Sequence, residues 1–173
     1  MKFVINTLDS RLFLGIYFSL LPFVTVGCSN VHDPNSKPAA EFVLKQGGKV
    51  IRAGSDLPID SPAKIPKEEF AIREIDLTDS KIKNIDMKNL SNLPYLESLN
   101  LHGTGLTNKG LAQITDLPNL QSLELAYTRV TDEEVSKLTR FPKLRKVFLY
   151  GTPIKPQTIE DLKSNLNGCA VYK

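Results

Sequence analysis

Residues that carry out chemistry are scarce in this chain. It has two cysteines, two histidines and no tryptophan among 173 residues, so a scaffold built on several disulfides is excluded. The sequence contains no glycine-rich phosphate loop, no CxxC pair, no HExxH and no serine-elbow motif. A formal net charge of only +3 favours neither nucleic acid nor an acidic membrane surface as a partner. The sequence therefore predicts no metal, no cofactor and no nucleic-acid partner.

Two acidic groups are the remaining candidates for acid–base chemistry. Asp132, Glu133 and Glu134 precede a helical pattern of apolar residues, so we expect them in the first turn of a helix, where the helix dipole favours negative charge. Glu68 and Glu69 are adjacent in the sequence and are expected to face water. An enzyme needs titratable groups that converge in a pocket, and nothing here predicts such a set. We therefore predict that the protein is not an enzyme.

Apolar residues recur with a period of 24 positions over residues 72–166. In each of four copies, an apolar residue opens the copy and two more follow three and five positions later. These residues are Ile72, Ile75 and Leu77; Leu96, Leu99 and Leu101; Leu120, Leu123 and Leu125; and Leu144, Val147 and Leu149. We expect them to point into the core, while the third, fifth and seventh positions of each copy point to the open face of a sheet. Such a period indicates a solenoid of stacked units.

The L-x-x-L-x-L pattern of these copies resembles that of the leucine-rich repeat family. The resemblance implies an α/β solenoid: a short right-handed arc with a parallel sheet on its concave face and helices on its convex face. The family carries Asn at the ninth repeat position, where this chain has hydroxyl residues, which are smaller hydrogen-bonding groups: Ser80, Thr104, Thr128 and Thr152. We expect four repeats in residues 72–167 and a closing strand in residues 168–173.

Signals for helices follow the predicted strands. Thr131 with Glu134 fits a capping box, and Pro156 stands where the first residue of a helix often lies. A proline near the end of each of the first three copies is expected to stop the helix before the next strand: Pro94, Pro118 and Pro142.

The first 27 residues have the profile of a signal peptide. Their apolar run, residues 12–26, is shorter than the roughly 20 residues of a membrane-spanning helix. Val26, Gly27 and Cys28 resemble the end of the lipobox of bacterial lipoproteins, although Thr25 stands where Leu is usual. The resemblance implies cleavage at Gly27, lipid on Cys28 and a location in the bacterial cell envelope, on the outer or periplasmic face of a membrane. Secretion or an uncleaved anchor is the alternative.

The segments on either side of the repeats are predicted to be a tether and caps. Residues 28–38 are polar, contain two prolines and have no periodicity, so we expect the lipidated cysteine to be followed by a disordered tether, which includes His32. Residues 39–71 are expected to form an N-terminal cap from a helix (39–46), a strand (49–52) and a loop, because the ends of a solenoid need covering. Cys169 is expected to be a small buried hydrophobic residue.

The open face of the predicted sheet carries residues that the core does not require. It is polar and acidic in the first copies and aromatic in the last ones. Phe148 and Tyr150 lie two apart on one strand and therefore share a face, and Tyr127 lies just past the end of the preceding strand. Exposed aromatic residues often anchor protein interfaces. We predict a binding site at Tyr127, Phe148 and Tyr150, with His102 and Glu124 at its margin.

Two other interpretations remain open at this stage. The closing segment, with Val171 and Tyr172, could fold over Phe148 and make the aromatic cluster part of the cap. The chain could also be a structural component of the envelope without a soluble partner. The resemblance to leucine-rich repeat proteins instead implies a rigid surface that recognises another protein. We therefore predict a membrane-tethered, non-catalytic module that binds an unidentified protein through its concave face.

Overall fold

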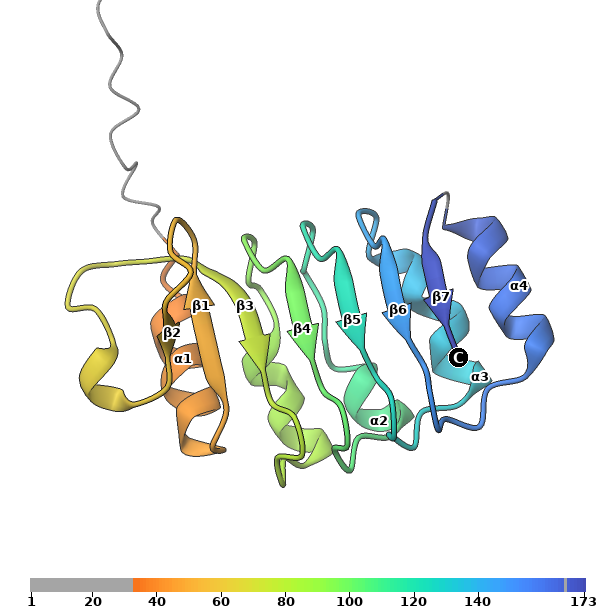
Figure 1. Ribbon diagram of the computed structural model, residues 1–173, viewed down its shortest axis with the longest axis horizontal. Helices are drawn as coiled ribbons and strands as arrows, with labels where there is room; N and C mark the ends of the chain where they lie inside the picture. The colour runs from red at the N-terminus through yellow and green to blue at the C-terminus, as the bar shows by residue number, and fades with distance from the viewer. Residues whose placement is uncertain (1–32, 167) are drawn as a thin grey trace, which may run out of the picture.

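One seven-stranded sheet runs through the computed structural model, which describes residues 33–166 and 168–173 (Figure 1). The strand order is β2-β1-β3-β4-β5-β6-β7. The strands are β1 (Lys49–Arg52), β2 (Pro58–Ile59), β3 (Ile72–Asp76), β4 (Ser98–Asn100), β5 (Ser122–Glu124), β6 (Lys146–Phe148) and β7 (Ala170–Tyr172). The predicted signal peptide, residues 1–27, and Cys28 lie outside the described residues. Within the described part, no helix has the length and apolar character needed to cross a membrane.

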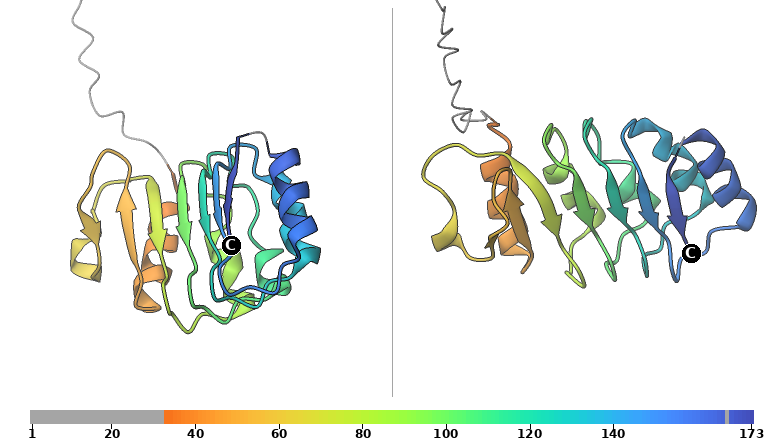
Figure 2. Two further views of the ribbon diagram at one scale, coloured as in Figure 1. Left: turned by 45° about the vertical axis from the view of Figure 1, so that its right-hand side comes forward. Right: turned by 45° about the horizontal axis from the view of Figure 1, so that its top comes forward.

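The spacing of 24 residues sets the register of the parallel part of the sheet. Strands β3 to β7 are parallel, and equivalent residues of successive copies pair with one another. One such row is Glu74, Ser98, Ser122, Lys146 and Ala170. The sheet forms one layer and the helices a second layer along one of its faces (Figure 2). The predicted α/β architecture with a mostly parallel sheet is therefore confirmed.

The core lies between these two layers. All twelve residues predicted to point inward from the strands are at most 1% exposed. The apolar residues of the helical halves complete the core, and these are Met87, Leu90, Leu111, Ile114, Val135, Leu138 and Leu162. Ile159 is only partly buried. Because each repeat buries its apolar residues against the next one, the repeats form one continuous core.

The helical halves of the first two repeats are shorter than predicted. The helices opposite the sheet are η2 (Asn84–Leu90), α2 (Asn108–Leu111), α3 (Asp132–Val135) with η3 (Ser136–Arg140), and α4 (Pro156–Asn165). The η elements are 3₁₀ helices. A three-residue strand spans roughly 10 Å. About five to seven residues of α or 3₁₀ helix cover that distance, which matches η2 with seven residues, whereas α4 at the end of the array has ten.

The predicted start signals of the helices are partly right. Pro156 is the first residue of α4, as expected. Thr131 is the N-cap of α3, but its side chain makes no capping hydrogen bond. Glu134 is turned inward and forms ion pairs with Lys137 and Arg140. The predicted capping box is therefore wrong, because ion pairing of Glu134 with two basic side chains replaces a bond to the start of its own helix.

The N-terminal cap begins earlier than predicted. Helix α1 (Ser36–Lys45) starts three residues before position 39, and Pro38 is tolerated because it lies in the first turn. The Ser36 hydroxyl donates to Asp33 Oδ2 at 2.6 Å and accepts the backbone N–H of Ile72 at 2.8 Å. This network ties α1 to the first repeat strand. Residues 36–38 therefore belong to the cap, and their assignment to a disordered tether is wrong.

The rest of the N-terminal cap covers the first edge of the sheet. Strand β1 pairs antiparallel with both β2 and β3, and a short 3₁₀ helix, η1 (Pro62–Lys64), follows β2. The predicted loop thus contains one strand and one helical turn. Gly48 precedes β1 and passes so close to β3 that an added Cβ would lie 2.5 Å from the Asp76 carbonyl oxygen, which explains why a glycine stands there.

The closing segment extends the sheet at its other edge. Strand β7 pairs with β6 in register, and Cys169 just before it is 7% exposed. Burial raises the pKa of the Cys169 thiol, although Arg145 acts in the opposite direction. The Lys173 ammonium donates to the carbonyl groups of Thr152 and Ile154. These bonds hold the last described residues against the fourth repeat.

Candidate functional site

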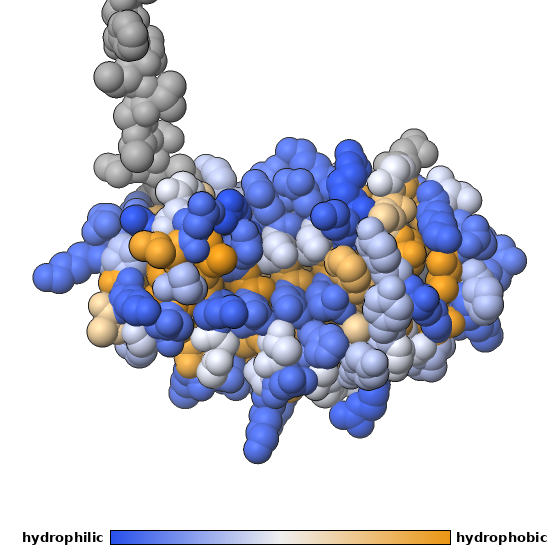
Figure 3. Space-filling model, in the orientation of Figure 1, coloured by the Kyte–Doolittle hydropathy of each residue, from blue (hydrophilic) through white to orange (hydrophobic). Residues whose placement is uncertain are grey.

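The open face of the sheet, which we call the strand face, faces the viewer in Figure 3. It is hydrophilic over most of its area, with hydrophobic residues gathered toward both ends of the sheet. The fifth repeat position crosses this face in the order Asp76, Asn100, Glu124, Phe148 and Tyr172. The face therefore changes from polar to aromatic along the array, as the sequence predicts.

Three polar residues of this row also support the ends of their strands. Side-chain oxygens of Asp76, Asn100 and Glu124 accept the backbone N–H two residues later, at 3.0, 3.0 and 2.8 Å. At Asp76, burial acts to raise the pKa, but hydrogen bonds from Thr78 and Lys49 outweigh it, so the pKa lies below its usual range. At Asn100 an uncharged amide oxygen accepts the equivalent hydrogen bond. The charge of Glu124 is therefore not needed for this turn.

The aromatic residues predicted as a binding site lie on the strand face but form two groups. Phe148 is half-buried and stacks on Tyr172, with ring centroids 4.6 Å apart and an angle of 10° between the rings. Tyr127 and Tyr150 are 63% and 46% exposed. Strand β7 extends the sheet beside Phe148 and does not fold over it. Phe148 is therefore shared between the face and the cap, whereas Tyr127 and Tyr150 are available to a partner.

Tyr172 is a member of this cluster that the sequence prediction placed only in the alternative. It is 39% exposed and pairs in register with Phe148. A signal for it was present, because Tyr172 lies 24 residues after Phe148, which is one repeat period. Extending the period beyond the fourth copy would have placed both rings in one row.

Tyr127 occupies a backbone position that is unfavourable for its residue type. The eighth position of every repeat has a left-handed conformation, with φ values of 55° at Asp79, 66° at Gly103, 55° at Tyr127 and 67° at Gly151. Glycine adopts this region freely, whereas a bulky side chain there is an outlier that costs about 1 kcal/mol or more. The Tyr127 ring lies against Gly151, where an added Cβ would be 2.6 Å from Tyr127 Cδ1. The tyrosine is thus both strained and mostly exposed.

His102 and Glu124 lie beside Tyr127. The His102 ring meets the Tyr127 ring edge to face, with centroids 5.1 Å apart, and its Nδ1 is 4.0 Å from Glu124 Oε1. The backbone N–H of Tyr127 donates to the Tyr150 carbonyl at 2.7 Å. The structure therefore brings together four of the five predicted site residues at the end of strands β4 to β6. Phe148, the fifth, is the last residue of β6 and pairs in register with Glu124, so it borders this group while it stacks on Tyr172.

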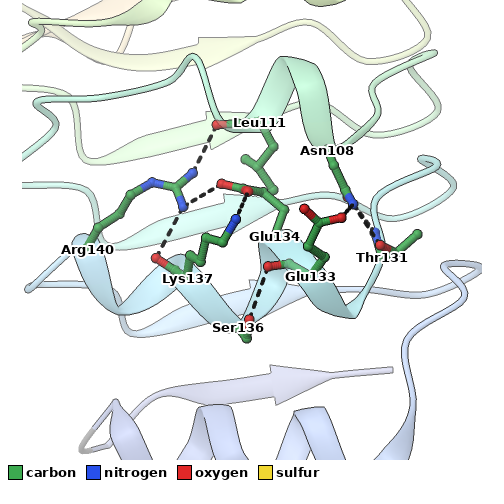
Figure 4. A network of polar contacts seen from close by, with 8 residues as sticks. All are labelled: Asn108, Leu111, Thr131, Glu133, Glu134, Ser136, Lys137 and Arg140. Carbon is green, nitrogen blue, oxygen red and sulfur yellow. Dashed lines mark hydrogen bonds and ion pairs between the residues drawn. The ribbon is translucent and has the colours of Figure 1, made fainter.

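The acidic cluster at Asp132, Glu133 and Glu134 has a structural role, and Figure 4 shows the contacts of Glu133 and Glu134. Glu134 is 4% exposed and lies within 2.9 Å of Arg140 and 3.1 Å of Lys137. Arg140 also donates to the carbonyl of Leu111 in the preceding repeat at 2.9 Å. Contacts with these two basic side chains stabilise the charge of Glu134. Among the described residues, no group of three or more His, Cys, Asp or Glu could hold a metal ion.

Comparison with known families identifies the repeats. The model of the family described as "Leucine rich repeat" matches residues 71–130, which include β3, β4 and β5. Together with the mostly parallel sheet and the helices along one face, this match confirms that the fold is a leucine-rich repeat fold. Domains of this kind generally serve as non-catalytic modules for protein interaction. A comparison with curated proteins finds no match to the chain.

Proposed function

We propose that this protein is a non-catalytic module that binds another protein through its strand face, which is concave in leucine-rich repeat proteins. The contact would centre on Tyr127, Tyr150 and Phe148, with His102 and Glu124 at its margin. One observation carries the proposal: Tyr127 is 63% exposed although it holds a left-handed backbone conformation. Residues that hold a strained backbone conformation without becoming buried are typically retained for function.

The decisive variant is Tyr127→Gly, because glycine suits the backbone at this position. Relief of the strain and the greater freedom of glycine in the unfolded chain are each worth about 1 kcal/mol and oppose one another. We therefore expect the melting temperature to change by no more than about 3 °C. Binding should fall sharply, because a large exposed aromatic side chain is lost.

The chain offers a matched control for this test. Asp79 has the same φ of 55° at the same repeat position, in the first repeat and away from the tyrosines. Crosslinking and capture from the native envelope, followed by mass spectrometry, should recover a partner with the parent chain and with Asp79→Gly. The yield with Tyr127→Gly and Tyr150→Ala should be strongly reduced. Equal recovery with all four chains would refute the proposal, as would a large loss of stability in Tyr127→Gly.

We further propose that the domain is tethered to a bacterial membrane through lipid on Cys28. The support is the lipobox-like sequence Val26, Gly27 and Cys28 after an apolar run. The short stretch between Cys28 and the first described residue, Asp33, would hold the domain close to the membrane surface.

A further inference from the structure

Glu124 differs from two other carboxylates of the strand face, Asp76 and Glu74, because no lysine or arginine of the described residues pairs with it. Asp76 is paired with Lys49 at 3.2 Å, and Glu74 is paired with Arg73 at 3.0 Å. The cation-forming neighbour of Glu124 is His102, at 4.0 Å, which is charged only if protonated.

One oxygen of Glu124 remains available to a ligand. Oε1 accepts the backbone N–H of Ala126 at 2.8 Å, and no described residue donates a hydrogen bond to Oε2. The side chain is 22% exposed, so a ligand group can reach it. An accessible carboxylate that lacks a counter-charge favours a cation.

The aromatic residues beside Glu124 favour the same kind of ligand. The face of a tyrosine ring carries negative electrostatic potential and attracts a cation placed over it. Tyr127 is linked to Glu124 through His102, which contacts both side chains, and Tyr150 follows Tyr127 across the sheet. The exposed lysine of β6, Lys146, pairs in register with Ser122 and lies two residues toward the start of the strands. No ion pair joins Lys146 to Glu124 in the described part of the chain.

We propose that this corner of the strand face receives an arginine side chain of the partner protein. The planar guanidinium would lie over the rings of Tyr127 and Tyr150 and donate to Glu124 Oε2. Arginine suits the site better than lysine, because a planar guanidinium both stacks on aromatic rings and forms directed hydrogen bonds with a carboxylate. The inference rests on the proposed function, since it names the chemistry by which the same surface recognises its partner.

A pair of small peptides tests the inference without the partner. The blocked tripeptide acetyl-Gly-Arg-Gly-amide is compared with its citrulline counterpart, which keeps the shape but loses the charge. Titration to millimolar concentrations should shift the ring resonances of Tyr127 and Tyr150 in nuclear magnetic resonance spectra. We expect the citrulline peptide to bind at least about fivefold more weakly, as the loss of a cation–π contact and of an ionic hydrogen bond predicts.

Two variants with the same change in net charge show whether Glu124 is responsible. Glu124→Gln keeps an oxygen that can accept the Ala126 N–H, so the fold should be unaffected, but arginine affinity should fall at least about fivefold. Glu97→Gln removes an exposed carboxylate just before β4, at the opposite end of the strands, and should leave the affinity unchanged.

Several results would overturn the inference: equal binding of the two peptides, no shift of either tyrosine with the arginine peptide, or equal affinities of the two variants. The proposed function fails separately, in the capture experiment with Tyr127→Gly. If capture of the partner depends on Tyr127 but not on Glu124, the protein-binding proposal holds and only the proposed arginine contact is refuted.

Discussion

The threonine hydroxyl groups at the ninth repeat position form hydrogen bonds that stabilise the bend after each strand. Thr104 and Thr128 donate their hydroxyl groups to the carbonyls of Leu101 and Leu125, three residues earlier, at 2.8 and 2.6 Å, and Thr152 does the same with Leu149. These bonds stay within one repeat. These threonine hydroxyl groups, which stand where the family carries Asn, therefore stabilise the bend of their own repeat and do not link neighbouring repeats. At Ser80 the hydroxyl oxygen is buried with no partner.

Leu125 tests the register of the repeats at the scale of one residue. It is fully buried in the third repeat, so Leu125→Asp would place an unpaired charge in the core and should cost several kcal/mol of unfolding free energy. Ser122→Asp adds the same charge to the half-exposed strand face of β5 and should cost less than about 1 kcal/mol. Urea denaturation followed by circular dichroism compares the two. Equal midpoints for both variants would contradict the register.

At the residue scale, burial could be predicted from the sequence but conformation could not. The apolar period identified the inward residues, because strand alternation and the repeat length fix their direction. The left-handed backbone of Tyr127 carries no such signal, since tyrosine is not a residue that favours φ > 0. Only its neighbours at equivalent positions, Gly103 and Gly151, indicated it. Comparing equivalent positions across copies would have revealed the strain.

At the scale of elements, successive repeats are joined by a ladder of side chains at the start of the helices. The amide of Asn84 donates to Thr107 Oγ1 at 2.8 Å and its oxygen accepts the Thr107 N–H at 3.1 Å. Asn108 repeats both bonds with Thr131, at 2.7 and 2.8 Å. Asp132 Oδ1 then accepts the N–H of Lys155 at 2.9 Å, which lowers the pKa of Asp132. These bonds use the hydroxyl of Thr131 and explain why it does not cap its own helix.

Removing one rung should weaken the contact between two repeats. Asn108→Ala leaves the partly buried N–H and hydroxyl of Thr131 without their partner, so we expect a loss of about 1–3 kcal/mol in unfolding free energy. Asn89→Ala is the control, because Asn89 is exposed and donates only to Asp86 within its own helix, at 2.8 Å. Chemical denaturation should show a lower midpoint for Asn108→Ala alone. If both variants unfold at the same concentration, the ladder does not contribute to stability.

The lengths of the helices were the element-scale feature that the sequence could not predict. Capping signals and prolines mark where a helix can begin or end, but they do not say how much of the segment between them is helical. Helices α2 and α4 have four and ten residues although the strand after each has three, so the length of the strand does not determine the length of the helix either. Glu134 shows the same limit, since its ion pair with Arg140 depends on how the chain folds after the helix.

At the scale of the whole molecule, the two ends of the array are covered in different ways. The N-terminal end has helix α1 and two antiparallel strands, whereas the C-terminal end has one parallel strand and α4. Composition and glycines located the N-terminal cap, but the early start of α1 follows from a tertiary contact, the bond between Ser36 and the Ile72 N–H. Asp33 is 3% exposed, so the described fold begins at that residue.

Because the described fold begins at Asp33, lipid on Cys28 would hold the domain closer to the membrane than the sequence predicted. Only five residue steps separate Cys28 from Asp33, a reach of at most roughly 18 Å for an extended chain. The tether predicted from the sequence ended at residue 38 and would have been about twice as long. If Cys28 is lipidated, the domain therefore lies directly at the membrane surface, and a partner embedded in or bound to that membrane is within its reach.

Labelling in a bacterial host decides whether Cys28 is the anchor. Labelled fatty acid should enter the parent chain and be absent from Cys28→Ala, and the parent should sediment with membranes. Cys169→Ala is the matched control, because Cys169 is buried and burial raises the pKa of its thiol, which leaves it protonated and unreactive. This control should keep the label. Label in Cys28→Ala equal to that in the parent, or a parent chain found in the soluble fraction, would show that the domain is not held by lipid on Cys28.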